Sequence, residues 1–308
     1  MILTSNRLGL IIFIIVICTS FSACCGDCDD IEEEIFLEGG LYLGQDPPGM
    51  TPESFAPPEL RANENWYWYG SPTFTPDLKE MYFTKYNSDN TLELNFTQYS
   101  NGGWTSPRRP DFSYSNSENS PTFSSDGNTV YFLSRMSDGR IRKSVRNGDS
   151  WFRSIPLQLV DPSGFNIGWQ IFLVDDNVLY YELGDDARNN IYRSEINGFQ
   201  LGTPELVDEI DDIAFDLTPF IAPDEEYIIF SSARSGGYGS FDLYISFKQI
   251  DGILGEPINM GTTINTPYKE AWPYVSPDGL YFFFVSIDGE DAGNPFWLDA
   301  QIIENYRD

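Results

Sequence analysis

The sequence predicts an all-β protein: a single β-propeller of five four-stranded blades, with six blades as the alternative. The main observation is a sequence motif that recurs five times and predicts a strand, a tight turn and a second strand. Its copies are SPTFTPDLKEMYFT from Ser71, SPTFSSDGNTVYFLS from Ser120, WQIFLVDDNVLYYE from Trp169, TPFIAPDEEYIIFSS from Thr218 and WPYVSPDGLYFFFVS from Trp272. The turn aspartates Asp77, Asp126, Asp175, Asp224 and Asp278 lie 49, 49, 49 and 54 residues apart. This period, in β-rich units, is typical of propellers.

Each copy has the composition of a β-hairpin. In the copy SPDG, Pro277 presets φ, Asp278 bonds the backbone ahead of it, and Gly279 accepts a positive φ. The flanking residues are aromatic or β-branched, as half-buried strands prefer. We therefore interpret the five aspartates as turn residues rather than as metal ligands or acid–base groups.

Two further elements follow each hairpin. A third strand is predicted at LELNFTQY from Leu92, IRKSVR from Ile141, NIYRSE from Asn190, FDLYISF from Phe241 and FWLDAQII from Phe296. A fourth, proline-containing element follows at WTSPRRPDF from Trp104, WFRSIPLQLV from Trp151, LGTPELV from Leu201 and LGEPINM from Leu254. Proline is tolerated on edge strands, so these segments suit the outermost strand of a blade.

The fifth copy lacks this fourth element, and a matching segment stands at the other end of the propeller. GMTPESFAPPEL, residues 49–60, has the proline-centred pattern and precedes the first hairpin. We predict that it supplies the outer strand of the last blade. Such closure removes open sheet edges.

The repeated phrase resembles the WD40-like repeat of TolB-type propellers, often called PD40. Copies two, four and five match it well, copy one fairly and copy three poorly. The stretches NTPYKEAWPYVSPDGLYFFF and RSGGYGSFDLYISF resemble exported propellers of Bacteroidetes-type bacteria. TolB itself has six blades and an additional α/β domain, and the sequence shows neither.

The N-terminus predicts export and lipid anchoring. Residues 1–23 have the organisation of a signal peptide, with Arg7 before an apolar core from Leu8 to Cys18. Phe21-Ser22-Ala23-Cys24 resembles a lipobox, which would make Cys24 the lipidated residue; an ordinary secretory signal ending at Ala23 is the alternative. Residues 24–40 are then an acidic flexible tether and 41–308 the propeller. The expected location is the cell envelope, at the outer membrane or on the cell surface.

Composition restricts the partners. There are 47 acidic and 18 basic residues, for a net charge of −29, which argues against nucleic acid and against direct adhesion to anionic lipid. We expect a monomer that meets the membrane through its lipid anchor alone. The four cysteines all precede residue 29, so the propeller contains neither a disulfide nor a cysteine nucleophile.

Several catalytic classes are excluded by the absence of histidine. Ser-His-Asp and Cys-His catalysis and His-ligated metal sites all need that residue. Carboxylate chemistry and oxygen-ligated calcium remain open, the latter at Asp138 or within 288–291. No catalytic, cofactor or metal residue is assigned. The leading hypothesis is a non-enzymatic binding or scaffold module for protein or peptide partners. The alternative is a carbohydrate-active or glycan-binding envelope protein.

A ligand is expected where the loops leading into the inner strands meet the loops between second and third strands. The candidates on this face are Trp66, Trp68, Glu118, Arg135, Trp169, Asp216, Arg234, Tyr238 and Glu270. Aromatic and charged side chains that converge at one end of the propeller channel are what a binding site requires. A structural alternative pairs Glu118 and Glu270 with Arg135 and Arg234 between blades and uses the Trp66 to Tyr69 cluster for packing.

Overall fold

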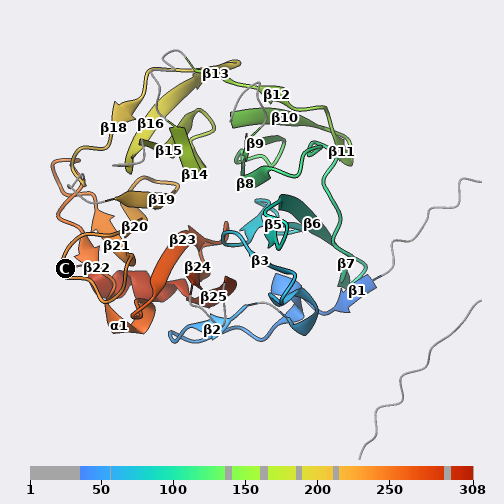
Figure 1. The fold of residues 1–308 in the computed structure, drawn as a ribbon, viewed down its shortest axis with the longest axis horizontal. Coiled ribbons are helices and arrows are strands. Elements are labelled where there is room, and N and C mark those ends of the chain that lie inside the picture. The colour runs from blue at the N-terminus through green and yellow to red at the C-terminus, as the bar shows by residue number, and fades with distance from the viewer. Residues whose placement is uncertain are drawn as a thin grey trace, which may run out of the picture. The chain divides into compact units, whose positions relative to one another are not determined.

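The computed structural model describes residues 35–55, 57–135, 141–159, 166–184, 189–210, 215–287 and 293–307, and all structural statements below concern these residues. They form five mainly antiparallel sheets around a central axis, so the predicted five-bladed propeller is confirmed (Figure 1). Within this part of the chain no helix is long and apolar enough to cross a bilayer.

Each sheet contains one copy of the repeated hairpin and the strands that follow it. Blade 1 contains β3 (Trp66–Trp68), β4 (Thr73–Phe74), β5 (Glu80–Asn87), β6 (Leu92–Ser100), β7 (Gly103–Thr105) and β1 (Ile35–Glu38). Blade 2 contains β8 (Glu118–Phe123), β9 (Thr129–Ser134), β10 (Ile141–Asn147), β11 (Ser150–Trp151) and β12 (Ile155–Pro156). Blade 3 contains β14 (Asn166–Val174), β15 (Val178–Gly184), β16 (Asn189–Asn197), β17 (Gln200–Leu201), β18 (Glu205–Leu206) and β13 (Gln158–Leu159).

The last two blades have four strands each. Blade 4 contains β19 (Asp216–Ile221), β20 (Tyr227–Ser232), β21 (Asp242–Phe247) and β22 (Ile258–Asn259). Blade 5 contains β23 (Lys269–Val275), β24 (Tyr281–Ile287), β25 (Asn294–Asp299) and β2 (Glu53–Ser54). The short helical turns are η1 (Tyr42–Gly44), η2 (Pro58–Leu60), α1 (Gly261–Ile264) and η3 (Ala300–Tyr306).

The ring closes as the sequence predicts. Strand β2 pairs antiparallel with β25, with Glu53 opposite Trp297 and Ser54 opposite Phe296. The next residue, Phe55, is fully buried and packs edge-on against the Phe283 ring at 5.1 Å and the Trp297 ring at 5.2 Å. The N-terminal segment therefore completes blade 5 with both backbone pairing and a large apolar anchor.

The N-terminal part also contributes a strand within the range predicted as a tether. Strand β1 pairs antiparallel with β7, although residues 24–40 read as an acidic spacer. Its Ile35 and Leu37 are half-buried while Phe36 and Glu38 are exposed, which is the alternation of an edge strand. Gly103 makes the approach possible, since a Cβ there would come within 2.5 Å of the Ile35 Cγ2.

The inner strands share a bulge that joins neighbouring blades. Ser120, Thr218 and Trp272, each directly before a proline, have positive φ angles of 53°, 49° and 54°, and the register of the ladder shifts at each of them. The backbone amide of Ile171 donates to Ser120 Oγ at 3.0 Å, and that of Trp272 to Thr218 Oγ1 at 3.1 Å. The bulges thus turn hydroxyl groups toward the next blade, the kind of re-aiming for which bulges are used.

The turn aspartates act as the sequence predicts in four of the five hairpins. Asp77, Asp126, Asp224 and Asp278 each accept a hydrogen bond from the backbone amide two residues ahead. In the third hairpin Asp176 instead accepts bonds from Ser125 of the preceding blade.

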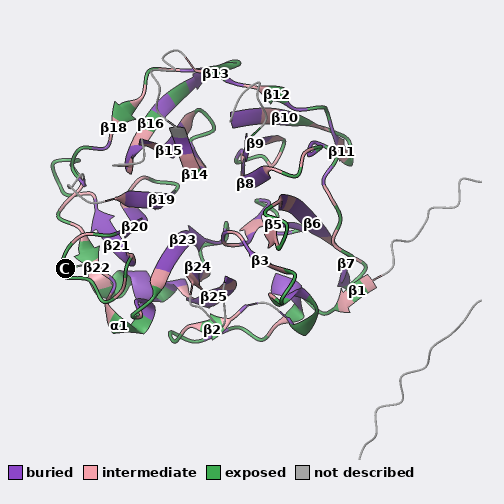
Figure 2. Ribbon diagram, in the orientation of Figure 1, coloured by how far each residue is buried: buried purple, intermediate pink, exposed green. Residues whose placement is uncertain are grey.

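Figure 2 shows how burial is distributed over the propeller: the strands nearest the axis are largely buried, and exposed residues gather on the outer strands and loops.

Candidate functional site

One cavity opens where the inner strands of four blades begin and where two second strands end. Its volume is about 460 Å³. The lining residues are Asn119, Leu133, Ser134, Arg135, Ile167, Gly168, Trp169, Gly184, Asn189, Phe215, Leu217, Phe241 and Lys269. We call this space the Trp169 cavity. It lies on the face predicted for a ligand, because the start of each inner strand brings the loop before it to the same end of the ring.

Trp169 and Lys269 form one wall of this cavity. The Trp169 side chain is 37% exposed, although it belongs to an inner strand. The Lys269 Nζ lies 4.8 Å from the centre of the Trp169 ring and 4.7 Å from that of Phe241. Burial lowers the pKa of Lys269, and the charge of Glu182 partly opposes that shift. The ammonium is thus held between two aromatic faces, an attractive arrangement for a cation.

Glu182 lies immediately behind the same wall and is fully buried. One carboxylate oxygen accepts a hydrogen bond from the Trp169 amide at 2.8 Å, and the other accepts one from the Thr218 amide at 2.5 Å. Burial raises the pKa of Glu182 to about 7, against these two bonds and the charge of Lys269. The residue joins the inner strands of blades 3 and 4.

Gly168 creates the space that Glu182 occupies. A Cβ at Gly168 would lie 1.8 Å from the Glu182 Oε2, so no larger residue fits while the carboxylate is in place. Sequence reasoning missed this pair, although a signal exists. Seven residues after the turn aspartate the other copies have Thr84, Leu133, Ser231 and Val285, and the third copy has an acid.

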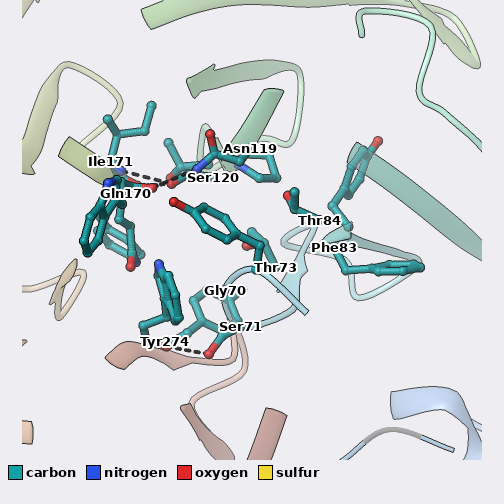
Figure 3. Close-up of a pocket in the computed structure, with 17 residues that line it drawn as sticks. Gly70, Ser71, Thr73, Phe83, Thr84, Asn119, Ser120, Gln170, Ile171 and Tyr274 are labelled. Atoms are coloured by element: carbon teal, nitrogen blue, oxygen red, sulfur yellow. Dashed lines mark hydrogen bonds between the residues drawn. The ribbon is translucent and has the colours of Figure 1, made fainter. Parts of the chain in front are cut away.

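A separate hollow of about 30 Å³ shares Asn119 and Trp169 with the Trp169 cavity. Figure 3 shows its lining residues. Gly70 and Ser71 of blade 1 lie on one side of it, and Asn119, Ser120 and Gln170 lie opposite. Gln170 is 9% exposed, and its Oε1 has no hydrogen-bond partner among the described residues.

A larger cavity of about 730 Å³ lies on the side of the hairpin turns and shares Thr73, Thr122, Phe172 and Tyr274 with this hollow. Its walls are mainly apolar and include Phe74, Phe123, Phe172, Phe220 and Val275. The described lining of the Trp169 cavity contains two cations, Arg135 and Lys269. In the larger cavity the charged groups among the described lining residues are Asp175, Asp176 and Glu304.

Of the predicted ligand-face residues, the structure brings Arg135 and Trp169 together in the cavity. Arg135 is exposed and follows β9 directly. Tyr238 is 51% exposed but does not line the cavity; its amide donates to Asp242. Cys24 lies outside the described residues, as do Asp138 and 288–291.

The tryptophans of blade 1 pack instead of facing a ligand. Trp68 is fully buried, and its Nε1 donates to the Leu60 carbonyl at 2.8 Å. Trp66 is half-buried, with its ring 6.3 Å from that of Trp68 and with Lys85 Nζ 4.9 Å from its centre. The cause is the segment after β2, because its Phe55 and Leu60 belong to the same buried cluster as Trp68.

The acidic candidates are buried and stabilise their own loops. Glu118 accepts from Ser113 Oγ at 2.6 Å and from the Tyr114 amide at 3.1 Å. Glu270 accepts from Thr266 Oγ1 at 2.6 Å and from Ser286 Oγ at 2.8 Å. Burial raises the pKa of both carboxyl groups.

Asp216 and Arg234 form an ion pair within blade 4. The Arg234 Nη2 lies 3.0 Å from Asp216 Oδ1 and also donates to the Ile210 carbonyl. Its guanidinium stacks 5.0 Å from the ring centres of both Phe230 and Tyr244. The alternative in which Glu118 and Glu270 pair with Arg135 and Arg234 between blades is therefore not found, because Glu118, Glu270 and Arg234 have partners within their own blade or loop.

No family model and no curated protein sequence matches this chain. Among solved structures, a thermostable family-43 glycoside hydrolase is similar over 77% of this chain and 90% of its own, with 16% identity and a TM-score of 0.51. TolB from Acinetobacter baumannii is similar over 74% of this chain, with 17% identity and a TM-score of 0.49. The match covers 53% of that TolB, so this chain spans about half its length.

A gluconolactonase from Xanthomonas campestris is similar over 88% of this chain and 98% of its own, with 11% identity and a TM-score of 0.47. At these identities the comparisons establish the propeller fold and no activity, because one fold hosts many unrelated functions.

Proposed function

We propose that this protein is a non-catalytic binding module and that its ligand, or a segment of a partner protein, occupies the Trp169 cavity. The observation that carries the proposal is an exposed Trp169 beside Arg135 and Lys269 in a cavity of about 460 Å³. A concave, largely apolar site with a few placed polar groups is the usual form of a ligand pocket.

The positions of the carboxylates favour binding over hydrolysis. Glycoside hydrolysis needs two carboxylates that face the scissile bond. No Asp or Glu is among the described residues that line the Trp169 cavity. The buried acids near this face, Glu118, Glu182, Asp216 and Glu270, are engaged by protein groups. A glycan ligand remains compatible with the exposed Trp169, since a flat aromatic face suits the apolar face of a sugar.

The test is a Trp169→Ala variant screened with the wild type against a panel of peptides and oligosaccharides by calorimetry. We expect a ligand of the wild type to lose affinity by at least about tenfold, because a large aromatic contact is removed. Phe152→Ala is the matched control, since Phe152 is 56% exposed and does not line the cavity. Equal affinities of all three proteins would place the site elsewhere, and reducing-sugar release by the wild type would overturn the non-catalytic assignment.

The proposal includes anchoring of the propeller in the cell envelope through Cys24. Its support is the sequence of residues 1–34, where an apolar core precedes Phe21-Ser22-Ala23-Cys24. Metabolic labelling with a palmitate analogue in a bacterial host tests it: Cys24→Ala should remove the label, and Cys25→Ala should keep it. A label that persists in Cys24→Ala, or is absent from the wild type, would contradict the anchor.

A further inference from the structure

We infer that the Trp169 cavity recognises a carboxylate-bearing ring, with Lys269 and Arg135 as receptors for the carboxylate and Trp169 as the platform for the ring. The inference rests on the proposed function and adds the chemical class of the ligand. It depends on three features of the cavity: its charge, the fixed position of one cation, and its apolar walls.

The charge of the described lining is opposite to that of the whole chain. The chain has 47 acidic and 18 basic residues, yet the described lining contains two cations, Arg135 and Lys269, and no acid. Neither side chain forms an ion pair or hydrogen bond with a described residue; the backbone amide of Arg135 donates to the Ser117 carbonyl. A cavity with one sign of charge and low-dielectric walls concentrates counter-charged ligands. The ligand that fits this charge is an anion.

The position of Lys269 makes the site more than an exposed basic residue. Its ammonium is held between the rings of Trp169 and Phe241, at 4.8 Å and 4.7 Å. A partly buried ammonium without a bonded counter-ion has lost hydration that a carboxylate can replace. The carboxylate of Glu182 does not fill this role, because its two oxygens accept the Trp169 and Thr218 amides.

The remaining lining favours a ring attached to that carboxylate. Trp169 is 37% exposed, and the half-buried Phe215 and Phe241 supply further apolar surface. A volume of about 460 Å³ lies at the small end of the range for ligand pockets, which suits one or two rings. The Asn189 amide adds a polar group for hydroxyl or carbonyl oxygens of the ligand.

Two pairs of small probes test the inference by calorimetry on the whole propeller. One pair is glucuronate and glucose, and the other is phenylacetate and phenylacetamide; each pair differs chiefly in charge. We expect at least one acid to bind about ten to a hundred times more tightly than its neutral partner, as a charge-assisted bond implies. The pair with the tighter acid identifies whether the natural ring is a sugar or an aromatic.

Variants assign the charge to its residues. Arg135→Gln and Lys269→Met should each weaken the preferred acid by at least about tenfold and leave the neutral probe unchanged, and Lys269→Arg should restore part of the affinity. Arg135 is exposed, so its variant tests the inference even if the Lys269 variant fails to fold. Lys85→Met is the matched control, since Lys85 also lies over a tryptophan, Trp66 at 4.9 Å, outside the cavity.

Each outcome separates this inference from the proposed function. Acids and neutral probes that bind equally, acids that do not bind, or acid affinity that survives both charge variants would overturn the inference. A Trp169→Ala variant that then still loses a ligand from the broader panel would leave the binding function intact.

Discussion

Replacing Glu182 by glutamine should remove the part of the pH dependence of the free energy of unfolding that comes from this one residue. Its carboxyl group is fully buried, and burial raises its pKa from 4.5 to about 7 in the folded protein. The folded state therefore binds a proton at pH values where the unfolded chain has released it. Such a group stabilises the protein fully below the unfolded pKa, and this contribution is lost as pH rises through the folded pKa.

The size of the effect follows from the shift. One pKa unit corresponds to about 1.4 kcal/mol, so the free energy of unfolding should fall by roughly 3 kcal/mol between pH 4.5 and 8 because of Glu182 alone. A glutamine side chain does not titrate, and it keeps one carbonyl oxygen for either the Trp169 or the Thr218 amide. Loss of the second acceptor adds an offset that is independent of pH. The variant should therefore be the less stable protein at low pH. As pH rises, Glu182 lowers the stability of the wild type, whereas glutamine adds no pH dependence to the variant, so the two curves should converge or cross.

Urea unfolding followed by tryptophan fluorescence at half-unit steps of pH measures both curves. Glu118 and Glu270 also have raised pKa values, but they are present in both proteins and cancel in the difference. Glu225→Gln, at a partly exposed side chain outside this wall, is a control that should leave the wild-type slope unchanged. Parallel curves for wild type and Glu182→Gln between pH 4.5 and 8 would refute the reasoning.

Three further predictions concern the assembly of the ring. Phe55→Ala should lower the free energy of unfolding, measured by chemical denaturation, by about 3–5 kcal/mol, because it removes the buried ring that packs the closing segment onto blade 5. An unchanged denaturation midpoint would show that this segment does not stabilise blade 5. Gly168→Ala should lower the unfolding free energy by about 1–3 kcal/mol, and combination with Glu182→Ala should recover only part of this loss, because it removes the Oε2 contact at 1.8 Å and leaves the Cβ of residue 182 only 2.6 Å from the new methyl. Arg146→Met should lower the free energy of unfolding by roughly 2–4 kcal/mol, since it leaves the Glu80 carboxylate buried without its cation. If the double variant Arg146→Met/Glu80→Gln is no more stable than Arg146→Met alone, that explanation is contradicted.

The blade and the closure of the ring can both be predicted from the sequence. The repeat is local: Pro277, Asp278 and Gly279 set a turn within four residues, and alternating apolar residues decide which strand faces are buried. Closure is also predictable, since one outer-strand pattern is missing after the last hairpin and one stands before the first. The hairpins depend on neighbours in the chain, so periodicity and turn chemistry are enough to predict them. Closure pairs β2 with the distant β25, and it is predictable because the number of outer-strand patterns has to match the number of hairpins.

Which residues of the predicted face can meet a ligand depends on the tertiary fold. Both Trp68 and Trp169 lie on inner strands, yet Trp68 is fully buried beneath the N-terminal segment while Trp169 faces the cavity beside Lys269. The space for Glu182 depends on Gly168, which lies across the hairpin on the neighbouring strand. The contact of Trp169 with Lys269 joins segments far apart in the sequence, and a motif that recurs in every blade does not encode which of its copies will be covered, paired or left open.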